Sequence, residues 1–382
     1  MNPSLRGKPI AVVPMMAETT CCIAASYEAK AFGIKTGTMV RDALRMCPNL
    51  ILIEGNHEKY IHYHERIVEA VESCHPVTSV LSIDEMACRL QGRDQKPENA
   101  MALAQQIKKS ILSVGSQLKS SVGLGPNRFL AKTASDMKKP DGLTLILKKD
   151  LPQIMYKLKL RDLCGIGENM ERRLNQHGVF TMEQLYKLDL PKIRKVWGGI
   201  GGEYFYRWLR GEDFLLSHQE HQSIGHSHVL PPDLRNQDSA YSVIQKLLYK
   251  AGVRLRKYNL WAQSMSVSIR YLDGYKWAND VNMLECQDDM SLREILKHLW
   301  SQRMPGAPLK VSVVLFNLIH DSERTFSFLE NQDQKRLQLT KAMDQINSRF
   351  GKYTLYFGGM KAAELAAPTR IAFSNIPSLD EA

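Results

Sequence analysis

The stretch LSIDEMACRL, residues 81–90, sets two adjacent acidic residues, Asp84 and Glu85, between two apolar runs. Burying an ionised carboxylate is costly unless the group is paired or bound to a metal ion. Successive side chains of a strand point to opposite faces of a sheet, so the two carboxylates can serve one site only where the strand breaks. The stretch therefore predicts a tight hairpin with the acidic pair at its tip. Two interpretations of that tip stay open: a solvated turn, or a site for a hard cation such as Mg²⁺.

Composition narrows the class of protein. A chain of 382 residues exceeds the size of a single core, so several domains are expected. The seven cysteines form no C-x-x-C pair, which argues against zinc ribbons and disulfide scaffolds and favours a reducing cytoplasm. The first apolar run, PIAVVPMMA, is short and broken by proline, and nowhere do roughly 18 apolar residues follow one another, so we expect a soluble protein without a signal peptide or membrane partner. The net charge of +11 favours a polyanionic partner, nucleic acid first.

The first 150 residues have the pattern of a mixed sheet with helices on it. The expected elements are a strand at 8–13, helical spacing over 26–48, a helix at 58–71, the hairpin around Asp84, a helix at 99–118, a strand at 120–124, a helix opened by Pro126 and Asn127, and a strand at 143–147.

The sequence pattern then changes twice. Residues 151–210 read as short helices separated by glycine-containing turns, and residues 217–237 as a polar, histidine-rich tether that leads into a strand. Beyond the tether the expected elements are a helix at 237–257, strands at 261–272 and 276–285, a helix at 290–303, a strand at 310–318 and a helix at 332–349. This is the split β-α-β order of a ferredoxin-like domain. We expect a loosely ordered tail after Met360.

Three further stretches carry groups that could contact phosphate. In SYEAKAFGIKTG, residues 26–37, Tyr27 and Lys30 lie one helical turn apart, although a capped amphipathic helix explains the stretch equally well. In NRFLAKTASDMKKPDG, residues 127–142, a helix ends at a proline turn beside Lys138 and Lys139, and such lysines are usually only solvated.

The stretch LCGIGENMERRL, residues 163–174, resembles a helix-hairpin-helix. Gly165 and Gly167 allow close approach of the backbone, and the N–H groups opening the next helix can bind phosphate. A plain helical turn is the alternative. The last domain adds a basic surface, which is either a solvated face or a cradle for a duplex. Its members are Lys246, Lys250, Arg254, Arg256 and Lys257 on one helix, with Arg270 and Lys276 on strands.

These stretches resemble, in order and approximate spacing, the Y-family translesion DNA polymerases of the UmuC/DinB type. The resemblance runs through NPSLRGKPIAVV (residues 2–13), AASYEAKAFGIKTG (24–37), SIDE (82–85), VGLGPNRFLAKTASDMKKPDG (122–142) and LCGIGENMERRL (163–174). It implies an α+β right-hand polymerase with a C-terminal ferredoxin-like little finger. The implied parts are a palm remnant at 1–16, fingers at 17–57, palm at 58–148, thumb at 149–216, linker at 217–236, little finger at 237–350 and a tail at 351–382.

The resemblance also implies roles for residues. Asp84 would bind Mg²⁺ and Glu85 would be the adjacent catalytic carboxylate, while Tyr27, Lys30 and Lys139 would contact the incoming dNTP. The implied partners are primer-template DNA, damaged DNA above all, and a sliding clamp, with the polymerase acting as a monomer in the DNA damage (SOS) response. The sequence departs from the family at Lys30, where arginine is usual, and at Ala24, where a phosphate-contacting threonine is common, and both departures weaken the expected hold on nucleotide.

A further departure concerns the metal site, which in two-metal phosphoryl transfer needs at least one more carboxylate. In the family a strand ending in D-x-D, followed by an aromatic steric gate, precedes the segment that matches NPSLRGKP, which here begins at Asn2. Glu18 and Glu28 lie in the fingers-like region and cannot replace it. We therefore expect a chain truncated at its N-terminus, with little or no polymerase activity. The alternative is a noncatalytic DNA-binding accessory of repair.

Other candidate sites are weaker. A zinc site from His218, His221, His226 and His228 lacks supporting cysteines or carboxylates, and the spacing of His57, His62 and His64 does not put three ligands on one helix face. The stretch ERTFSFLE, residues 323–330, is faintly similar to clamp-binding peptides but lacks their glutamine. A hairpin-containing repair nuclease is disfavoured because its carboxylates would not lie among triphosphate-binding motifs.

Overall fold

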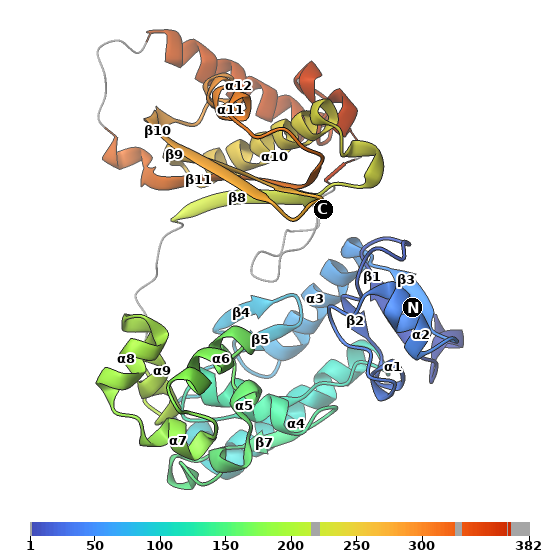
Figure 1. The fold of residues 1–382 in the computed structure, drawn as a ribbon. Coiled ribbons are helices and arrows are strands. Elements are labelled where there is room, and N and C mark those ends of the chain that lie inside the picture. The colour runs from blue at the N-terminus through green and yellow to red at the C-terminus, as the bar shows by residue number, and fades with distance from the viewer. Residues whose placement is uncertain (1, 215–221, 325–330, 365, 368–382) are drawn as a thin grey trace. The chain divides into compact units, whose positions relative to one another are not determined.

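The computed structural model describes residues 2–214, 222–324, 331–364 and 366–367. The chain divides into two compact units, residues 1–215 and 216–369 (Figure 1). Each unit is described by itself. Besides the elements named below there are short 3₁₀ helices at Pro3–Leu5, Gly92–Gln95, Lys148–Asp150, Met155–Lys157, Leu160–Asp162, Pro232–Leu234 and Asp321–Glu323.

The first unit begins with a small sheet in the order β2-β1-β3. Its strands are β1 (Ile10–Val13), β2 (Ala24–Ala25) and β3 (Ile51–Glu54), with helices α1 (Tyr27–Ala31) and α2 (Val40–Met46) beside them. The helical spacing predicted over 26–48 is therefore two helices rather than one. The reason is the segment between them, where Gly33 and Gly37 take φ values of +86° and +88° that do not fit a right-handed helix.

Two pairs of strands follow, and they do not join into the single mixed sheet that was predicted. Strands β4 (Ser79–Ser82) and β5 (Glu85–Ala87) form an antiparallel hairpin, and β6 (Val122–Leu124) and β7 (Leu143–Leu145) form a parallel pair. Helices α3 (His57–Glu72), α4 (Pro97–Val114) and α5 (Arg128–Met137) accompany them. A Cβ built on Gly123 would lie 2.0 Å from the carbonyl oxygen of Ala131, so glycine is what allows β6 and α5 to touch.

Short helices complete the first unit, as predicted for residues 151–210. They are α6 (Glu168–Gln176), α7 (Met182–Lys187), α8 (Leu190–Trp197) and α9 (Ile200–Leu209). This helical part is attached to α5: the rings of Phe129 and Phe205 meet edge to face at 5.2 Å. The side chain of Asn127 also donates hydrogen bonds to the carbonyl oxygens of Trp208 and Glu212, at 2.8 and 2.9 Å.

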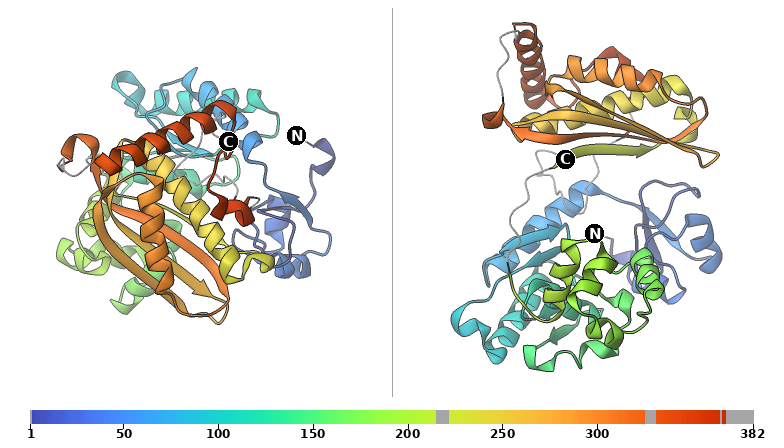
Figure 2. Two further views of the ribbon diagram at one scale, coloured as in Figure 1. Left: turned by 90° about the horizontal axis from the view of Figure 1, so that it is seen from above. Right: turned by 60° about the vertical axis from the view of Figure 1, so that its left-hand side comes forward.

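The second unit has the element order predicted for its last domain. Strands β8 (Ser223–Val229), β9 (Leu260–Tyr271), β10 (Lys276–Cys286) and β11 (Pro308–His320) form an antiparallel sheet in the order β10-β9-β11-β8. Helices α10 (Gln237–Lys257) and α11 (Asp289–Ser301) cover one face of that sheet (Figure 2). The predicted tether at 217–236 is too long, because β8 lies inside it. Strand β8 pairs along β11 and buries Ile224 in the core beneath α10.

The segment after β11 also packs on this unit. Helix α12 (Asn331–Phe350) lies on α11, and the 3₁₀ helix η8 (Gly358–Ala363) lies on α10. Met360 and Ala363 are buried, so the prediction of a loosely ordered tail after Met360 is wrong for the residues that follow it as far as Ala363. Residues 368–382 of that predicted tail lie outside the described residues.

Candidate active site and DNA-binding surfaces

The acidic pair lies at the tip of the β4–β5 hairpin, where the sequence placed it. Asp84 is in the turn and is exposed, while Glu85 is the first residue of β5. The hydroxyl of Ser82 donates a hydrogen bond of 2.8 Å to Asp84 Oδ1. Beneath the turn, Nδ1 of the buried His64 lies 2.8 Å from the carbonyl oxygen of Ile83, which anchors the hairpin to α3. The tip is thus a fixed loop that presents two carboxylates.

A string of alternating charges links this tip to the lysine turn after α5. The ammonium group of Lys132 lies 2.6 Å from Glu85 Oε1 and 3.3 Å from Asp136 Oδ2. Asp136 Oδ1 lies in turn 2.6 Å from the ammonium group of Lys139. Partial burial works against the charge of Lys132, yet the hydrogen bond to Glu85 and the charge of Asp136 outweigh it and raise the pKa of Lys132. The structure therefore brings Glu85 and Lys139, which are far apart in the sequence, into one region.

The turn that carries Lys139 is held from below by Lys108 of α4. Its ammonium group donates to Asp141 Oδ1 at 2.5 Å and to the carbonyl oxygens of Asp141, Gly142 and Ser120. A Cβ on Gly142 would lie 2.0 Å from the carbonyl oxygen of Lys138, so this compact turn requires glycine. Lys108 was not singled out from the sequence, because a lysine within an amphipathic helix gives no sign of such partners.

The predicted pair in the fingers-like region also lies together. The ammonium group of Lys30 lies 4.4 Å from the centre of the Tyr27 ring on α1. Hydrogen bonds lower the pKa of Glu28 on α1 and of Asp141 in the lysine turn, and the positive charge of the exposed Lys119 adds a smaller contribution to each shift.

The hairpin tip offers only a few possible ligands for a metal ion among the residues that the structure describes. Asp84 and Glu85 offer the hard oxygen donors that Mg²⁺ prefers, and their place at a hairpin tip fits such an ion. Among the residues that the structure describes, no group of three or more His, Cys, Asp or Glu side chains is placed to hold a metal. The two carboxylates are therefore a partial ligand set.

The glycine hairpin before α6 is open to approach. Gly165 has a φ of +89° and Gly167 caps the N-terminus of α6. No atom lies within 4 Å of a Cβ built on either glycine, and residues 167–169, which open α6, are exposed. The negative charges of Glu168 and Glu171 in the first turn disfavour binding of an anion there. Arg172, whose guanidinium group lies 3.5 Å from the Glu168 carboxylate, partly neutralises the charge of Glu168.

The face of the four-stranded sheet that the helices leave uncovered consists largely of small and basic side chains. Core residues Met265, Val267 and Ile269 of β9 face the helices, so the alternate residues face the other way. Following the register across the four strands, the uncovered rows are Ala278, Ser268, Ser312, Ser227; Asp280, Ser266, Val314, Gly225; and Asn282, Ser264, Phe316, Ser223. Eight of these twelve residues are Ser, Ala or Gly, and the larger ones are Asp280, Val314, Asn282 and Phe316. The row from Ala278 to Ser227, next to Arg270, holds only small side chains.

One end of this uncovered face is positively charged. Arg270 pairs in register with Lys276 on one side and with Lys310 on the other, and all three side chains are exposed. Like charges directly opposite on neighbouring strands destabilise a sheet, so such a row is typical of a surface that meets an anion. Lys310 and the serines were missed from the sequence, although the alternation in SMSVSIR, residues 264–270, is a usable signal.

The basic residues of α10 do not belong to that face, and the DNA contacts predicted for Lys246, Lys250 and Arg256 require a correction. Helix α10 packs on the opposite side of the sheet (Figure 2). Lys246 is 4% exposed, and its ammonium group donates to the carbonyl oxygens of Ala363, Glu364 and Ala366, at the end of η8. Lys246 therefore caps a helix end inside the protein and does not reach DNA. Lys250 bonds to the carbonyl oxygen of Ala367 in the same way.

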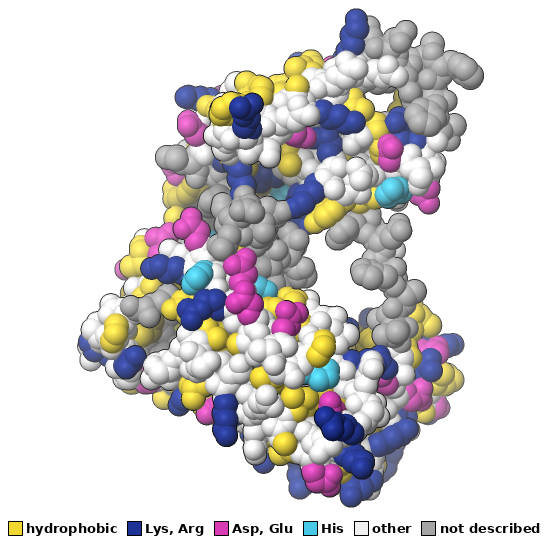
Figure 3. Space-filling model, turned by 180° about the vertical axis from the view of Figure 1, so that it is seen from behind, with side chains coloured by type: hydrophobic (Ala, Val, Ile, Leu, Met, Phe, Trp, Pro, Cys, Tyr) yellow, Lys and Arg dark blue, Asp and Glu magenta, His cyan; other side chains and the backbone are white. Residues whose placement is uncertain are grey.

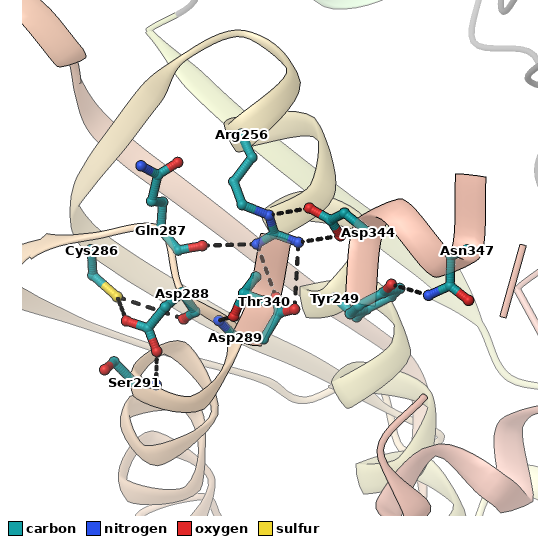
Figure 4. A network of polar contacts seen from close by, with 10 residues as sticks. All are labelled: Tyr249, Arg256, Cys286, Gln287, Asp288, Asp289, Ser291, Thr340, Asp344 and Asn347. Carbon is teal, nitrogen blue, oxygen red and sulfur yellow. Dashed lines mark hydrogen bonds and ion pairs between the residues drawn. The ribbon is translucent and has the colours of Figure 1, made fainter. Parts of the chain in front are cut away.

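Arg256 is the third of these residues. Its guanidinium group is buried and makes two bonds to Asp344 of α12, at 2.6 and 2.9 Å (Figure 4). It also bonds to Asp289 and to the carbonyl oxygen of Gln287, so its donors are engaged within the unit. Arg256 holds α10, α11 and α12 together and is not a DNA contact. Arg254 stays a prediction.

Other candidate groups can be placed briefly. On the face that Figure 3 shows, Lys and Arg side chains are spread over both units with Asp and Glu among them. His218, His221 and most of ERTFSFLE lie outside the described residues, and His226 is a partly buried strand residue. Burial, with the charges of Arg254 and Lys250, lowers the pKa of His226 to about 4. In the described ranges no helix is long and apolar enough to cross a membrane.

Family models and curated proteins that resemble the chain cover most of its length. The chain matches the impB/mucB/samB family over residues 1–136, its C-terminal domain over residues 221–328 and the thumb domain of DNA polymerase iota over residues 161–213. It is 30% identical to DNA polymerase IV of Moorella thermoacetica over 367 residues, which are 93% of this chain and 90% of that protein. It is also 30% identical to DNA polymerase IV 1 of Halalkalibacterium halodurans over 362 residues, 92% of this chain and 87% of that protein.

Solved structures give the class of fold. A Y-family DNA polymerase chimera of Dbh and Dpo4 has a TM-score of 0.71 and 22% sequence identity, covering 84% of this chain and 94% of that one. An insertion ternary complex of Dbh DNA polymerase has a TM-score of 0.56, with the same identity and coverage. The fold is therefore that of a right-hand polymerase with an additional C-terminal domain.

Within that class, the chain belongs to the Y-family DNA polymerases, the impB/mucB/samB family. The family match begins at residue 1, so the expectation that a first palm strand with an aspartate is missing stays a prediction.

Proposed function

We propose that this protein is a template-directed DNA polymerase that copies damaged DNA from dNTPs, or descends from one. The observation that carries the proposal is the charge string from Glu85 through Lys132 and Asp136 to Lys139. It joins a place for a divalent cation to a place for a triphosphate within one compact unit. Polymerase chemistry needs both places side by side, because metal ions bridge the phosphates during nucleotidyl transfer.

In this proposal each residue has a distinct task. Asp84 and Glu85 would hold Mg²⁺, which when bound neutralises charge on the transferring phosphoryl group. Tyr27 would donate a hydrogen bond to a phosphate oxygen, while Lys30 and Lys139 would act as point charges on the triphosphate. The N–H groups beyond Gly167 would contact the DNA backbone without reading its sequence.

The uncovered sheet face of the second unit is the proposed cradle for the duplex. Arg270, with Lys276 and Lys310 beside it, would contact phosphates, and the serines would let the backbone approach. Contacts of this kind make binding sequence-independent and strongly dependent on salt. Primer-template DNA would be held as a complex with monomeric protein in the cytoplasm. Engagement of a sliding clamp and induction in an SOS response belong to the same proposal.

The proposed chemistry is weak in these 382 residues alone. The two carboxylates at the hairpin tip are joined by no third ligand in the described residues, and Glu85 is already engaged by Lys132. We therefore expect tight DNA binding with little primer extension. The experiment is extension of a labelled primer with Mg²⁺ and dNTPs, with D84N as the matched control. Robust extension that D84N abolishes would refute the expectation of weak activity.

The second candidate is a noncatalytic DNA-binding accessory of repair, and the partial ligand set favours it. Fluorescence anisotropy of labelled primer-template separates the candidates. Binding of DNA that dNTP and Mg²⁺ do not strengthen would favour the accessory. A tighter complex only with the dNTP that pairs with the template base would favour the polymerase. Absence of DNA binding would overturn both.

A further inference from the structure

Lys132 is shared between two carboxylates that belong to different elements. Its ammonium group lies 2.6 Å from Glu85 of the hairpin and 3.3 Å from Asp136, one turn further along α5. The Lys132 side chain is 26% exposed and that of Asp136 is 32% exposed, so both groups are partly shielded from water. One positive charge cannot neutralise two carboxylates, so each partner competes for Lys132 with the other.

Asp136 is shared as well. Its Oδ1 lies 2.6 Å from the ammonium group of Lys139, and its Oδ2 faces Lys132. Any movement of Lys132 towards Asp136 therefore weakens the hold of Asp136 on Lys139, because a second cation then neutralises the same carboxylate. The four side chains alternate in sign, and each inner one has a partner on either side.

The backbone beneath these side chains is fixed. Lys132 and Asp136 are four residues apart on α5, which sets them on one face of the helix. The lysine turn is bonded to Lys108 through Asp141 and Gly142, and the hairpin turn is bonded to His64. We therefore expect side chains, rather than the main chain, to respond to a change of charge at either end.

We propose that Lys132 and Asp136 form an ion-pair relay that couples cation binding at Glu85 to phosphate binding at Lys139. The inference rests on the proposed function for the two ends, and it adds two positioning residues between them. A divalent cation at Glu85 displaces Lys132, which then pairs with Asp136. Lys139 is thereby released for a phosphate. The same relay works in reverse, because coupling between two binding sites is reciprocal.

For each of these residues the relay predicts whether a substitution tightens or weakens cation binding, and this can be measured without DNA or nucleotide. The probe is manganese(II) chloride alone, titrated into the full chain and followed by electron paramagnetic resonance of the free ion. K132Q removes the competitor for Glu85 and should tighten Mn²⁺ binding. D136N leaves Lys132 to Glu85 alone and should weaken it, whereas K139Q should tighten it. The expected changes are about twofold to fivefold, the range set by partly exposed ion pairs.

Direct electrostatic interaction of each charge with Mn²⁺, without any relay, would change the affinity in the same directions. The deciding measurement is therefore a double-mutant cycle. If the relay is correct, the effect of K139Q on Mn²⁺ affinity vanishes in a K132Q background, because the intermediate contact is gone. K132R should keep the coupling, and K138Q, which removes the neighbouring exposed lysine, should change Mn²⁺ affinity by less than about twofold.

Three outcomes would overturn the relay: additive effects of K132Q and K139Q, an effect of K138Q as large as that of K139Q, or no Mn²⁺ binding at all. Anisotropy of labelled DNA with the same variants is measured alongside. Intact DNA binding with a failed cycle overturns only the relay, whereas loss of DNA binding in the unmodified chain overturns the proposed function. Circular dichroism of each variant confirms that it is folded.

Discussion

Arg270 lies in the middle of a row of three cations that crosses three neighbouring strands. Lys276 pairs with it from β10 and Lys310 from β11, and the sheet beyond the row is lined by serines. Repulsion within the row disfavours the unbound state of the surface, so an anion that settles there relieves it. The position of the row on the uncovered face makes phosphate the natural partner.

We predict that R270Q weakens binding of primer-template DNA by about threefold to tenfold at low salt. The slope of log affinity against log salt should also become shallower by about 1, because one phosphate contact is lost. Anisotropy titrations over a series of salt concentrations measure both quantities. K341Q removes an exposed lysine from α12 and is the matched control. An unchanged slope in R270Q would contradict the assignment of phosphate contact to Arg270.

Asp289 is a buried carboxylate that shares its cation, Arg256, with Asp344. Arg256 makes two bonds to Asp344 and a longer pair to Asp289, at 3.1 and 3.4 Å. Burial raises the pKa of Asp289 to about 6, although Arg256 opposes the shift. Because Arg256 faces two carboxylates, one negative charge in the network stays uncompensated, and this supports the upward direction.

The sign of the pH dependence follows from that shift. Between about pH 4 and pH 6 the folded state holds a proton on Asp289 that the unfolded state has released, so this group lowers the free energy of unfolding as pH rises through that window. Below about pH 4 Asp289 is protonated in both states and does not change the free energy of unfolding. Above about pH 6 it is ionised in both states, and its full destabilising contribution is present.

We predict that D289N removes this dependence. The difference in the free energy of unfolding between D289N and the unmodified chain should therefore shift in favour of D289N by about 1.4 kcal/mol between pH 5 and pH 7.5. Urea unfolding followed by tryptophan fluorescence at the two pH values provides the measurement, and D280N, which removes an exposed charge from the same unit, is the control. An equal effect of D289N at both pH values would argue against the raised pKa.

At the scale of elements, two glycines of the first unit show opposite surroundings. A Cβ on Gly123 would meet the backbone of α5 at 2.0 Å, whereas a Cβ on Gly167 would meet nothing within 4 Å. The first glycine is required by packing between β6 and α5. The second leaves the N-terminus of α6 open, where we propose that a DNA phosphate binds.

We predict that G123A lowers the free energy of unfolding of the first unit by about 2–3 kcal/mol, because backbone cannot move aside as a side chain can. G167A should leave stability within about 0.5 kcal/mol and weaken DNA binding by about threefold, since its methyl group occupies the path of a phosphate. Thermal unfolding and DNA anisotropy of both variants provide the comparison. Loss of stability in G167A without loss of DNA affinity would contradict the proposed contact.

The elements that could be predicted are those whose structure is determined by the residue pattern within the element itself, without contacts from distant parts of the chain. The acidic hairpin tip was predicted because a charged pair between apolar runs has few other solutions, and α10 was predicted because its period is long and regular. The break between α1 and α2 was not, since Gly33 and Gly37 lie within otherwise continuous helical spacing. The strand expected at the end of the tether, β8, begins earlier than predicted, because four of its seven residues are serine or histidine and resemble the polar tether before them.

The candidate site followed the same division. Contacts within one element, such as Tyr27 with Lys30, could be predicted from spacing alone. Contacts between elements could not: Lys132 is an ordinary helix residue until the hairpin brings Glu85 beside it. Conversely, Lys246 and Arg256 have the residue type of DNA contacts, yet segments beyond residue 330 cover them with carbonyl and carboxylate oxygens. Residue type indicates charge, and only the tertiary structure determines which partner that charge meets.

At the scale of the whole molecule, the two proposed DNA contacts belong to separate compact units. The glycine hairpin before α6 is in the first unit and the basic row on β9, β10 and β11 is in the second. No residue takes part in both surfaces. Substitutions in separate units that share no partner are expected to act independently on the free energy of binding.

We therefore predict that G167A and R270Q combine additively. The affinity of the double variant for primer-template DNA should equal the product of the two single-variant ratios to within about twofold. Its salt slope should fall by the loss measured for R270Q alone, because G167A hinders a backbone contact and removes no charge. Anisotropy titrations of the four proteins at matched salt decide the point. A double variant no weaker than R270Q alone would mean that the glycine hairpin before α6 does not touch DNA, and the measured backbone contacts would then have to be assigned to the basic row of the second unit.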